Sequence, residues 1–334
     1  MSKNLKILFV TPFSITDHGG VQNQIMVSKQ YLLDKGYKVR IYSHGSTDYE
    51  NYPTIKVRFN SSVSKITIAC NKELLKEAIN RADIIHIHEP FIPLIIWRIR
   101  TKKKIITTHH ASLNNKFLHK ALRLIYNSFF RSHSITSIAV SKESYLNASS
   151  LSEDAIIISN YYMSTSSYNH NKGSKEVTFV GRNEKRKGLK VFLESIDNNL
   201  VGKYKFNVIT NTEKFDTKAN FFIDINDSMK NEILRNTKIL VAPNTKHESF
   251  GIVLLEGILN GALAVCSDLP AFKSVLGNSG IYFNTGDSKD LNSTLNELFN
   301  LNTDELWKEQ YNHISKYDIE NVYKDILKLY KNPF

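Results

Sequence analysis

The chain has 334 residues, of which 41% are hydrophobic and 23% charged. This is the balance of a globular protein with room for two domains, and no apolar run approaches the roughly 20 residues that a membrane-spanning helix needs. The two cysteines, Cys70 and Cys266, lie far apart, which excludes a disulfide scaffold or a zinc finger and favours a reducing compartment. We therefore expect a cytoplasmic protein, with the apolar run Ile7–Val10 as a first buried strand and not a signal peptide.

The positive charge lies almost entirely in the first half of the chain. The net charge is +12, and residues 1–160 hold 22 Lys and Arg against 11 Asp and Glu, whereas the remainder holds 22 against 21. A net +11 in one half and +1 in the other indicates that the first half meets an anionic partner. Nucleic acid, a phospholipid headgroup and a phosphorylated substrate all fit this charge.

Strands and helices are expected to alternate along the first half. A strand at 7–10 leads through Gly19 and Gly20 into a helix from Val21 to Leu32. A second helix is expected at Leu74–Ile79. Further short apolar runs predict strands at 39–42, 84–87, 105–108, 135–140 and 156–158.

The same alternation restarts after an irregular segment. Strands are predicted at 177–180, 206–209, 239–242 and 263–266, and helices at 189–196, 252–259 and 319–330. We expect an N-terminal domain of residues 1–163, a linker of residues 164–175 and a second domain of residues 176–315, followed by a last segment, 316–334. The pattern predicts two α/β domains with parallel sheets, and a ligand in a cleft at the carboxyl ends of their strands.

The residues that follow the predicted strands are the first candidates for a site. Gly19-Gly20 precedes a helix, where free backbone amides bind anions, although a bare glycine loop fits the sequence equally well. Gly181-Arg182 follows the first strand of the second domain, and Arg186-Lys187 comes a few residues later. Such a cationic pair would neutralise a diphosphate as it departs; the alternative is a solvated basic loop.

The segment from Glu248 to Glu256 carries the strongest signal. Glu256 lies eight positions after Glu248, so a helical rise of ~1.5 Å per residue would place the two carboxylates roughly 12 Å apart, about the span of a sugar diphosphate. One carboxylate could hold the sugar and the other the ribose, with the amides of Ser249, Phe250, Gly251 and Ile252 toward the phosphates. The alternative is a surface glutamate followed by an unrelated helical one.

Several segments together resemble glycosyltransferase family 4, whose members have the GT-B fold of two Rossmann-like domains facing each other across a cleft. Among the members of this family, the chain most resembles the bacterial phosphatidylinositol mannosyltransferases. The matching segments are Gly19–Asn23, His86–Pro90, Thr108–His110, Ala139–Ser141, Phe179–Arg182, Arg186–Gly188, Glu248–Glu256 and Ser267–Leu269.

The resemblance implies a role for individual residues. Gly19 and Gly20 would bind the donor diphosphate, which Arg182 and Lys187 would clamp. Glu248 would contact the transferred sugar and Glu256 the ribose. His110 would donate to a hydroxyl of the sugar, and Gln22 would lie near the acceptor. The last helix would return to the first domain.

The function implied is retaining transfer of a hexose from GDP-mannose or a UDP-sugar to a lipid-linked or glycan acceptor of the cell envelope. The segment between Phe206 and Ile239 is short for the family, so the base remains open. No metal and no other cofactor is expected, because two cations stand where a metal would. A sugar-nucleotide 2-epimerase of the same fold and a non-catalytic nucleotide-sugar-binding or membrane adaptor are the alternatives.

Two further patterns have simpler interpretations. His86 and His88 point to one side of a strand and Glu89 to the other, with no third ligand nearby in sequence, which argues against a metal site. Trp97 and Trp307 stand without a stacking motif, so nucleic acid is not expected as a partner. The oligomeric state stays open.

The basic residues of the first domain suggest a membrane surface. A helix is expected at Lys116–Arg131, with apolar residues on one side and cations on the other. The cations assigned to an anionic leaflet are Lys102, Lys103, Lys104, Lys116, Lys120 and Arg123. We therefore expect peripheral binding to the inner face of the cell membrane, although an ordinary surface helix fits the same spacing.

Overall fold

The computed structural model describes most of the chain in two units. The described residues are 5–17, 19–46, 53–59, 62–67, 70–90, 98–110, 135–149, 155–163, 169–171, 173–212 and 218–331. Unit 1 comprises Met1–Met163 and Ile319–Phe334, and unit 2 comprises Ser164–Asp318. Within the described part, no helix is long and apolar enough to cross a membrane.

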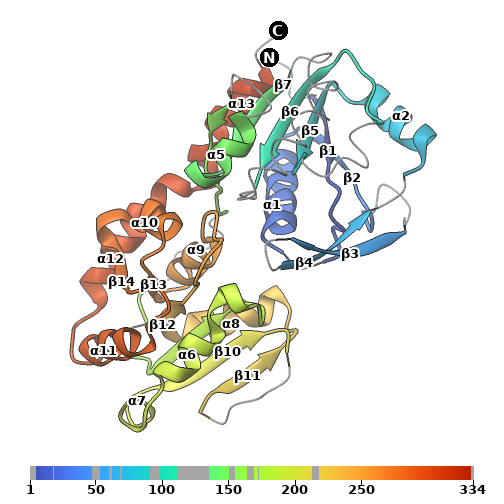
Figure 1. The fold of residues 1–334 in the computed structure, drawn as a ribbon. Coiled ribbons are helices and arrows are strands. Elements are labelled where there is room, and N and C mark those ends of the chain that lie inside the picture. Colours follow the sequence, from blue (N-terminus) through green and yellow to red (C-terminus); the bar gives the residue numbers. More distant parts are fainter. Residues whose placement is uncertain are drawn as a thin grey trace. The chain divides into compact units, whose positions relative to one another are not determined.

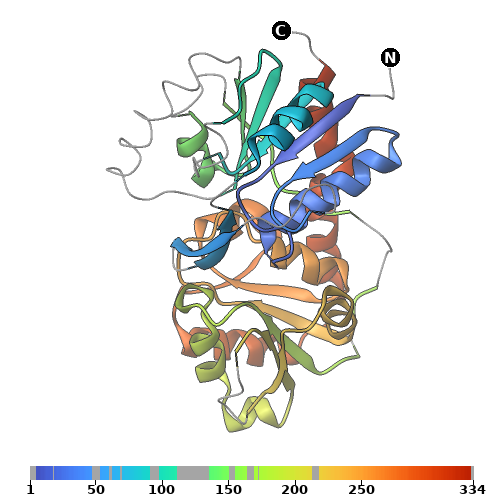
Figure 2. The same ribbon diagram turned by 90° about the vertical axis from the view of Figure 1, so that its right-hand side faces the viewer.

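Unit 1 is built on a parallel sheet of six strands in the order β2-β1-β5-β6-β7-β8. The strands are β1 (Lys6–Val10), β2 (Lys38–Tyr42), β5 (Ile84–His88), β6 (Lys104–His109), β7 (Ile135–Ala139) and β8 (Ile156–Ile157). The helices are α1 (Gly20–Asp34), α2 (Lys72–Arg81), α5 (Lys142–Ser149) and α13 (Ile319–Lys331). The last of these, red in Figures 1 and 2, belongs to unit 1 although it ends the chain.

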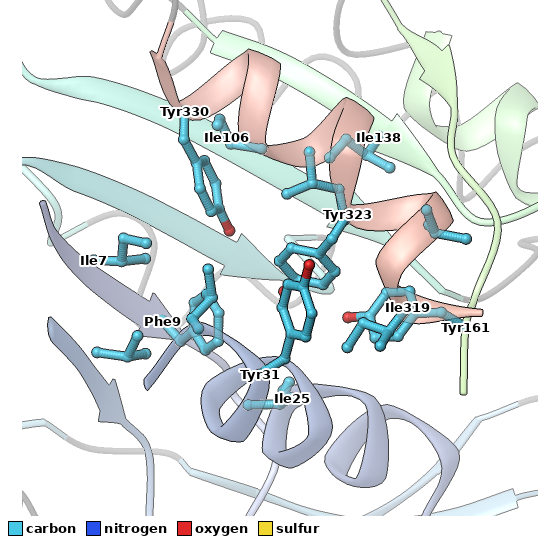
Figure 3. Packing of buried hydrophobic residues seen from close by; sticks show 14 of the residues in the cluster. Ile7, Phe9, Ile25, Tyr31, Ile106, Ile138, Tyr161, Ile319, Tyr323 and Tyr330 are labelled. Atoms are coloured by element: carbon cyan, nitrogen blue, oxygen red, sulfur yellow. The ribbon is translucent and has the colours of Figure 1, made fainter. Parts of the chain in front are cut away.

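Alternation along the strands divides the core of unit 1 into two layers. Leu8 and Val10 point to the face that α2 covers, and Ile7 and Phe9 point to the face that α1 and α13 cover. Figure 3 shows the second layer, in which tyrosines from both helices pack over the apolar residues of the sheet. The sheet is thus buried on both faces, as a parallel sheet requires.

A two-stranded antiparallel hairpin was not predicted. It consists of β3 (Thr54–Phe59) and β4 (Ser62–Thr67), and it packs through a bridge between Phe13 and Ile66 onto the segment that follows β1. Residues 55–59 alternate between apolar and basic side chains, which is the signal that could have revealed it.

Unit 2 contains a second parallel sheet of six strands, in the order β11-β10-β9-β12-β13-β14. Its strands are β9 (Glu176–Val180), β10 (Lys205–Thr210), β11 (Asn220–Ile223), β12 (Thr237–Ala242), β13 (Leu263–Ser267) and β14 (Ile281–Phe283). Its helices are α6 (Leu189–Ser195), α7 (Asn198–Val201), α8 (Asp227–Asn236), α9 (Ile252–Leu259), α10 (Pro270–Leu276), α11 (Ser288–Phe299) and α12 (Asp304–Ile314), with short 3-10 turns η1 (Lys185–Lys187), η2 (Gly277–Ser279) and η3 (Ser315–Tyr317).

The predicted α/β class with two parallel sheets is confirmed, but the predicted linker falls within unit 2, and so do residues 316–318 of the predicted last segment. His170 falls inside the predicted linker, yet it is buried in unit 2. Its Nδ1 lies 2.8 Å from the carbonyl oxygen of Gly261, its Nε2 lies 2.7 Å from Thr303 Oγ1, and its ring stacks on Trp307. Lack of periodicity was the basis for predicting a linker, and it does not exclude an irregular segment held by specific hydrogen bonds.

Candidate active site

The strand order of unit 2 shows at which point of its sheet a ligand is expected to bind. Strand β9 lies between β10 and β12; the connection that leaves β9 runs to β10 on one side, and the connection that leaves β12 runs to β13 on the other. Ligands of such sheets bind at this point, beyond the carboxyl ends of the two central strands. Here those ends lead to Gly181-Arg182 after β9 and to Pro243–Gly251 after β12. The structure therefore brings the predicted cations and the first predicted glutamate to one place within unit 2.

A buried carboxylate with several donors forms the centre of this site. Glu248 Oε2 accepts hydrogen bonds from Lys187 Nζ at 2.8 Å and from Asn244 Nδ2 at 2.6 Å, and Arg186 Nη1 lies 3.9 Å away. Burial would raise the pKa of Glu248, but the charges of Lys187 and Arg186 and a hydrogen bond from the Phe250 amide lower it below its usual value. Glu248 is therefore an anion, and the Phe250 amide is used within the protein.

The backbone of the two loops explains how these groups meet. His247, just before Glu248, has a φ of 53°, in the left-handed region that non-glycine residues rarely adopt. Gly188 has a φ of 73°, and a Cβ there would lie 1.8 Å from the carbonyl oxygen of Pro243. Only glycine permits this contact, which packs the loop after β9 against the loop after β12.

The second predicted cation has an acidic neighbour. Arg182 Nη1 lies 3.9 Å from Glu184 Oε1, and Arg186 Nη2 lies 2.8 Å from Glu184 Oε2. Glu184 and Asn244 were not predicted as site residues. A carboxylate between two arginines, four residues after a buried strand, is a signal that could have drawn attention to Glu184.

The second predicted glutamate has a partner of its own. Glu256 lies on α9, and its Oε1 is 3.0 Å from Nζ of Lys230 on α8. Burial would lower the pKa of Lys230, but the charges of Glu256 and Asp227 raise it above its usual value. Lys230 was not predicted as a site residue, because no helix was expected at the residues of α8.

The predicted separation of roughly 12 Å between the two glutamates depended on a helix that the structure does not contain. It assumed one continuous helix, whereas α9 begins only at Ile252. The preceding Gly251 has a φ of 101°, and a Cβ there would lie 2.6 Å from the ring of Phe272. The chain turns sharply at Gly251, so the residues before it do not follow the helical rise.

In unit 1 the predicted glycines lie at the start of α1. Gly20 is the first helical residue, and Gly19 is the N-cap, with an extended φ of −170° and no side-chain cap. Gln22 is buried and its Nε2 lies 3.3 Å from the carbonyl oxygen of Ser14, so it holds the loop after β1. A role of Gln22 toward an acceptor stays a prediction.

His110 follows β6 and is held by residues from other strands. Its Nε2 lies 3.1 Å from Nδ1 of His88, and its backbone amide donates to Glu89 Oε2 at 3.1 Å. Burial lowers the pKa of His110 to about 4, and a hydrogen bond with Asn160 acts in the opposite direction. The ring is therefore neutral at pH 7.

In the structure a third histidine, His110, lies beside His86 and His88, although it is distant from them in the sequence. His110 comes from the end of β6 to lie beside His88, and Glu89 turns toward it because strand alternation ends at His88 and Glu89 has a φ of 58°. Within the described residues, no group of three or more His, Cys, Asp and Glu side chains is arranged to hold a metal ion. The histidines contact one another instead of converging on one point.

The cations that were predicted to bind an anionic leaflet fall partly outside and partly inside the described residues. Lys116, Lys120 and Arg123 lie outside the described residues, as does the whole expected helix 116–131. Lys103 Nζ donates to the carbonyl oxygens of Ile79 and Asn80 at 2.9 and 2.7 Å, and so caps the end of α2. This contact gives Lys103 a structural role, whereas Lys102 is exposed.

Comparisons with known proteins agree with this architecture. The sequence model "Glycosyltransferase Family 4" matches residues 18–145, and the model "Glycosyl transferases group 1" matches residues 164–320. The two matches fall on the two units of the structure. The chain belongs to glycosyltransferase family 4, and its fold is the GT-B fold.

Individual relatives and solved structures are similar over nearly the full length. A phosphatidyl-myo-inositol mannosyltransferase of Mycobacterium leprae is 26% identical, and the alignment covers 98% of this chain and 96% of the relative. A glycosyltransferase from Rickettsia africae superposes with a TM-score of 0.72 at 17% identity, over 98% of both chains. Anabaena Alr3699/HepE, in complex with UDP and glucose, has a TM-score of 0.68 at 14% identity, covering 98% of this chain and 99% of that one.

Proposed function

We propose that this glycosyltransferase moves a hexose, with retention of configuration, from a nucleoside diphosphate sugar to a lipid-linked or glycan acceptor. The donor is GDP-mannose or a UDP-sugar. One observation carries this assignment: Lys187 pairs with the anionic Glu248 beyond the carboxyl ends of β9 and β12, and Arg182 follows β9 at the same edge of the sheet. A diphosphate needs fixed cations, and a sugar hydroxyl needs a fixed acceptor, at the point of the sheet where ligands bind.

The charges suggest how the donor would be held. Lys187 is a donor with three protons, of which one is used on Glu248, so it can bind a phosphate oxygen while keeping that contact. Arg182 would bind the same diphosphate with its planar fork. Glu248, kept ionised by its neighbours, would accept hydrogen bonds from hydroxyls of the sugar. Glu256 would accept from the ribose, and Lys230 fixes its carboxylate.

The transfer step requires charge stabilisation more than a protein nucleophile. The bond from the anomeric carbon to the terminal phosphate oxygen breaks, and the acceptor oxygen bonds to that carbon on the same face. The acceptor proton passes to the departing phosphate oxygen. Arg182 and Lys187 would stabilise the negative charge of the leaving diphosphate, in place of a metal. His110 would donate a hydrogen bond to a hydroxyl of the transferred sugar.

Charge and similarity to relatives indicate the kind of acceptor. The excess of basic residues in the first half of the chain and the similarity to phosphatidyl-myo-inositol mannosyltransferases support an acceptor anchored in an anionic membrane. The protein would then act at the inner face of the cell membrane, bound peripherally.

A donor screen tests the proposal directly. We expect UDP or GDP, but not ADP, to raise the melting temperature of the protein, because a ligand that binds only the folded state stabilises it. Lys187→Ala should abolish the shift, whereas Lys190→Ala should not, since that lysine is 87% exposed on α6 and pairs with Glu194 of the same helix. Absence of a shift with every nucleotide would contradict the donor assignment.

A transfer assay separates the alternatives. Labelled sugar nucleotide supplied with membrane lipid extract should yield a labelled lipid or glycan only when the acceptor is present. An epimerised or free sugar formed without acceptor would favour the 2-epimerase, and binding without any conversion would favour the adaptor.

A further inference from the structure

Three histidine rings form a row on one face of the unit 1 sheet. His86 and His88 are two residues apart on β5, so their side chains leave the strand on the same side, and their rings stack with centroids 4.4 Å apart. The ring of His110 stacks on that of His88 at 5.5 Å, with an angle of 20° between the planes. The row runs from within β5 to the carboxyl edge of the sheet.

All three rings are buried and neutral. Burial lowers the pKa of His86 to about 3 and that of His110 to about 4, and it lowers the pKa of His88 well below its usual value, with further contributions from neighbouring imidazoles. A neutral imidazole has one N–H and one nitrogen with a lone pair. Two neutral rings joined by a hydrogen bond therefore have linked tautomers.

The link between His88 and His110 is direct. Their nitrogens Nδ1 and Nε2 lie 3.1 Å apart. If His88 carries its proton on Nδ1, it donates to His110 Nε2, and the proton of His110 must be on Nδ1, the nitrogen that is left for the hydrogen bond with Asn160. The opposite assignment would leave the N–H of His88 at Nε2.

The surroundings of His88 select the first assignment. His88 Nε2 is buried and has no hydrogen-bond partner among the described residues. A buried N–H without an acceptor is rarer in proteins than an under-satisfied acceptor, so Nε2 is the nitrogen without the proton. His88 then donates through Nδ1.

The row is anchored at its other end by the last helix of the chain. His86 Nδ1 lies 2.6 Å from the hydroxyl of Tyr330, and its Nε2 lies 2.7 Å from Thr108 Oγ1. With both nitrogens bonded, the ring of His86 cannot turn, and it supports His88 by stacking. Figure 3 shows Tyr330 extending from α13 toward the sheet. The backbone of His110 is fixed separately, by Glu89.

We propose that His88 is a positioning residue that fixes the ring of His110 and holds it in the Nδ1–H tautomer, with Tyr330 of α13 securing the row through His86. The consequence for catalysis rests on the proposed function, in which His110 contacts the transferred sugar. His88 makes no contact with substrate in this proposal and acts only through His110.

Nuclear magnetic resonance of the full chain labelled with 15N-histidine tests the tautomer without any activity measurement. Two-bond 1H–15N correlations distinguish Nδ1–H from Nε2–H, and His110→Gln assigns the signals of His110. We expect Nδ1–H in the wild type. In His88→Phe, which keeps a stacked ring but removes the donor, His110 should shift toward Nε2–H. Nε2–H in the wild type, or an unchanged His110 pattern in His88→Phe, would overturn the proposal.

A conservative variant separates hydrogen bonding from packing. The side-chain amide of His88→Asn places an N–H near the former Nδ1, so it should restore the Nδ1–H pattern of His110. On the transferase reaction, His88→Phe should lower kcat by on the order of 10- to 100-fold with a donor KM within about twofold, and His88→Asn should recover most of it. Equal loss in both variants would show that His88 contributes packing alone.

A pair of tyrosine variants tests the anchor. Tyr330→Phe should move the signals of His86 and His110, because it removes the hydroxyl that bonds to His86. Tyr31→Phe is the control, since Tyr31 is also buried and its hydroxyl donates to Glu320 of α13 at 3.0 Å. Identical spectra for the two variants would contradict the role of Tyr330. If no transferase activity is found, the spectra still decide the positioning role, so the two proposals fail independently.

Discussion

Replacing Lys187 with alanine should affect turnover and stability for different reasons. The ammonium group is a fixed charge near the expected leaving group, and the loss of one such donor costs about 3 kcal/mol in the transition state, or roughly 100-fold in kcat. It is also the nearest cation to the buried carboxylate of Glu248. Sequence reasoning does not predict a stability effect, but the ion pair does.

The size of the stability effect follows from the contacts that remain. Leaving one member of a buried ion pair without its partner lowers the free energy of unfolding by roughly 3–5 kcal/mol. After Lys187→Ala, Glu248 keeps Asn244 at 2.6 Å, the Phe250 amide and Arg186 at 3.9 Å. We therefore expect a smaller loss, about 1–3 kcal/mol in the free energy of unfolding.

Urea unfolding and steady-state kinetics on the same samples measure the two effects. The double variant Lys187→Ala/Glu248→Gln should regain most of the lost stability, because a neutral amide needs no cation, but it should not regain turnover. Lys190→Ala should leave both unchanged. Wild-type kcat in Lys187→Ala would refute the diphosphate assignment, and a double variant no more stable than the single one would refute the charge argument.

The same carboxylate predicts a pH dependence. The pKa of Glu248 is lower in the folded protein than its usual value of 4.5, so it stabilises the fold above that pH, and the contribution is lost as the pH falls through the lowered value. Glu248→Gln should therefore lose less stability than the wild type when the pH is taken from 7 to 3. An equal loss in both proteins would contradict the lowered pKa.

Three further predictions concern cofactors, membranes and backbone. Sugar transfer should continue in excess EDTA, because side-chain cations stabilise the leaving group; a strict requirement for magnesium or manganese would refute this. The protein should sediment with vesicles that contain anionic lipid. The variant Lys102→Glu/Lys116→Glu/Lys120→Glu should sediment less, and so should the wild type at high salt, because electrostatic attraction is screened beyond ~8 Å already at physiological ionic strength. Equal sedimentation of the wild type and the variant would contradict the predicted membrane site. Gly251→Ala should lower the midpoint of thermal unfolding more than Gly286→Ala, because both glycines have positive φ but only the first would place its Cβ against an aromatic ring; equal shifts would show that the clash is relieved.

The sequence alone determined the fold class and most of the strands, and it singled out the candidate donor residues. Buried parallel strands are short continuous apolar runs, as at Ile7–Val10, and such runs are visible without any tertiary information. Residues just after those runs are where parallel sheets bind ligands, which is why Arg182, Lys187 and Glu248 could be singled out. Predicted strands differ from the observed ones by one or two residues at their ends, where chain pairing and not local pattern sets the limit.

Tertiary structure decided which charges are paired and which histidines meet. Lys230 lies 26 positions before Glu256, and Glu248 lies 61 positions after Lys187, so no local pattern could show these ion pairs. His110 reaches His88 only because β6 lies beside β5, and Tyr330 reaches His86 only because the last helix packs on the first sheet. Side chains that are distant in sequence become neighbours through the strand order and the packing of the helices, which exist only in the folded chain.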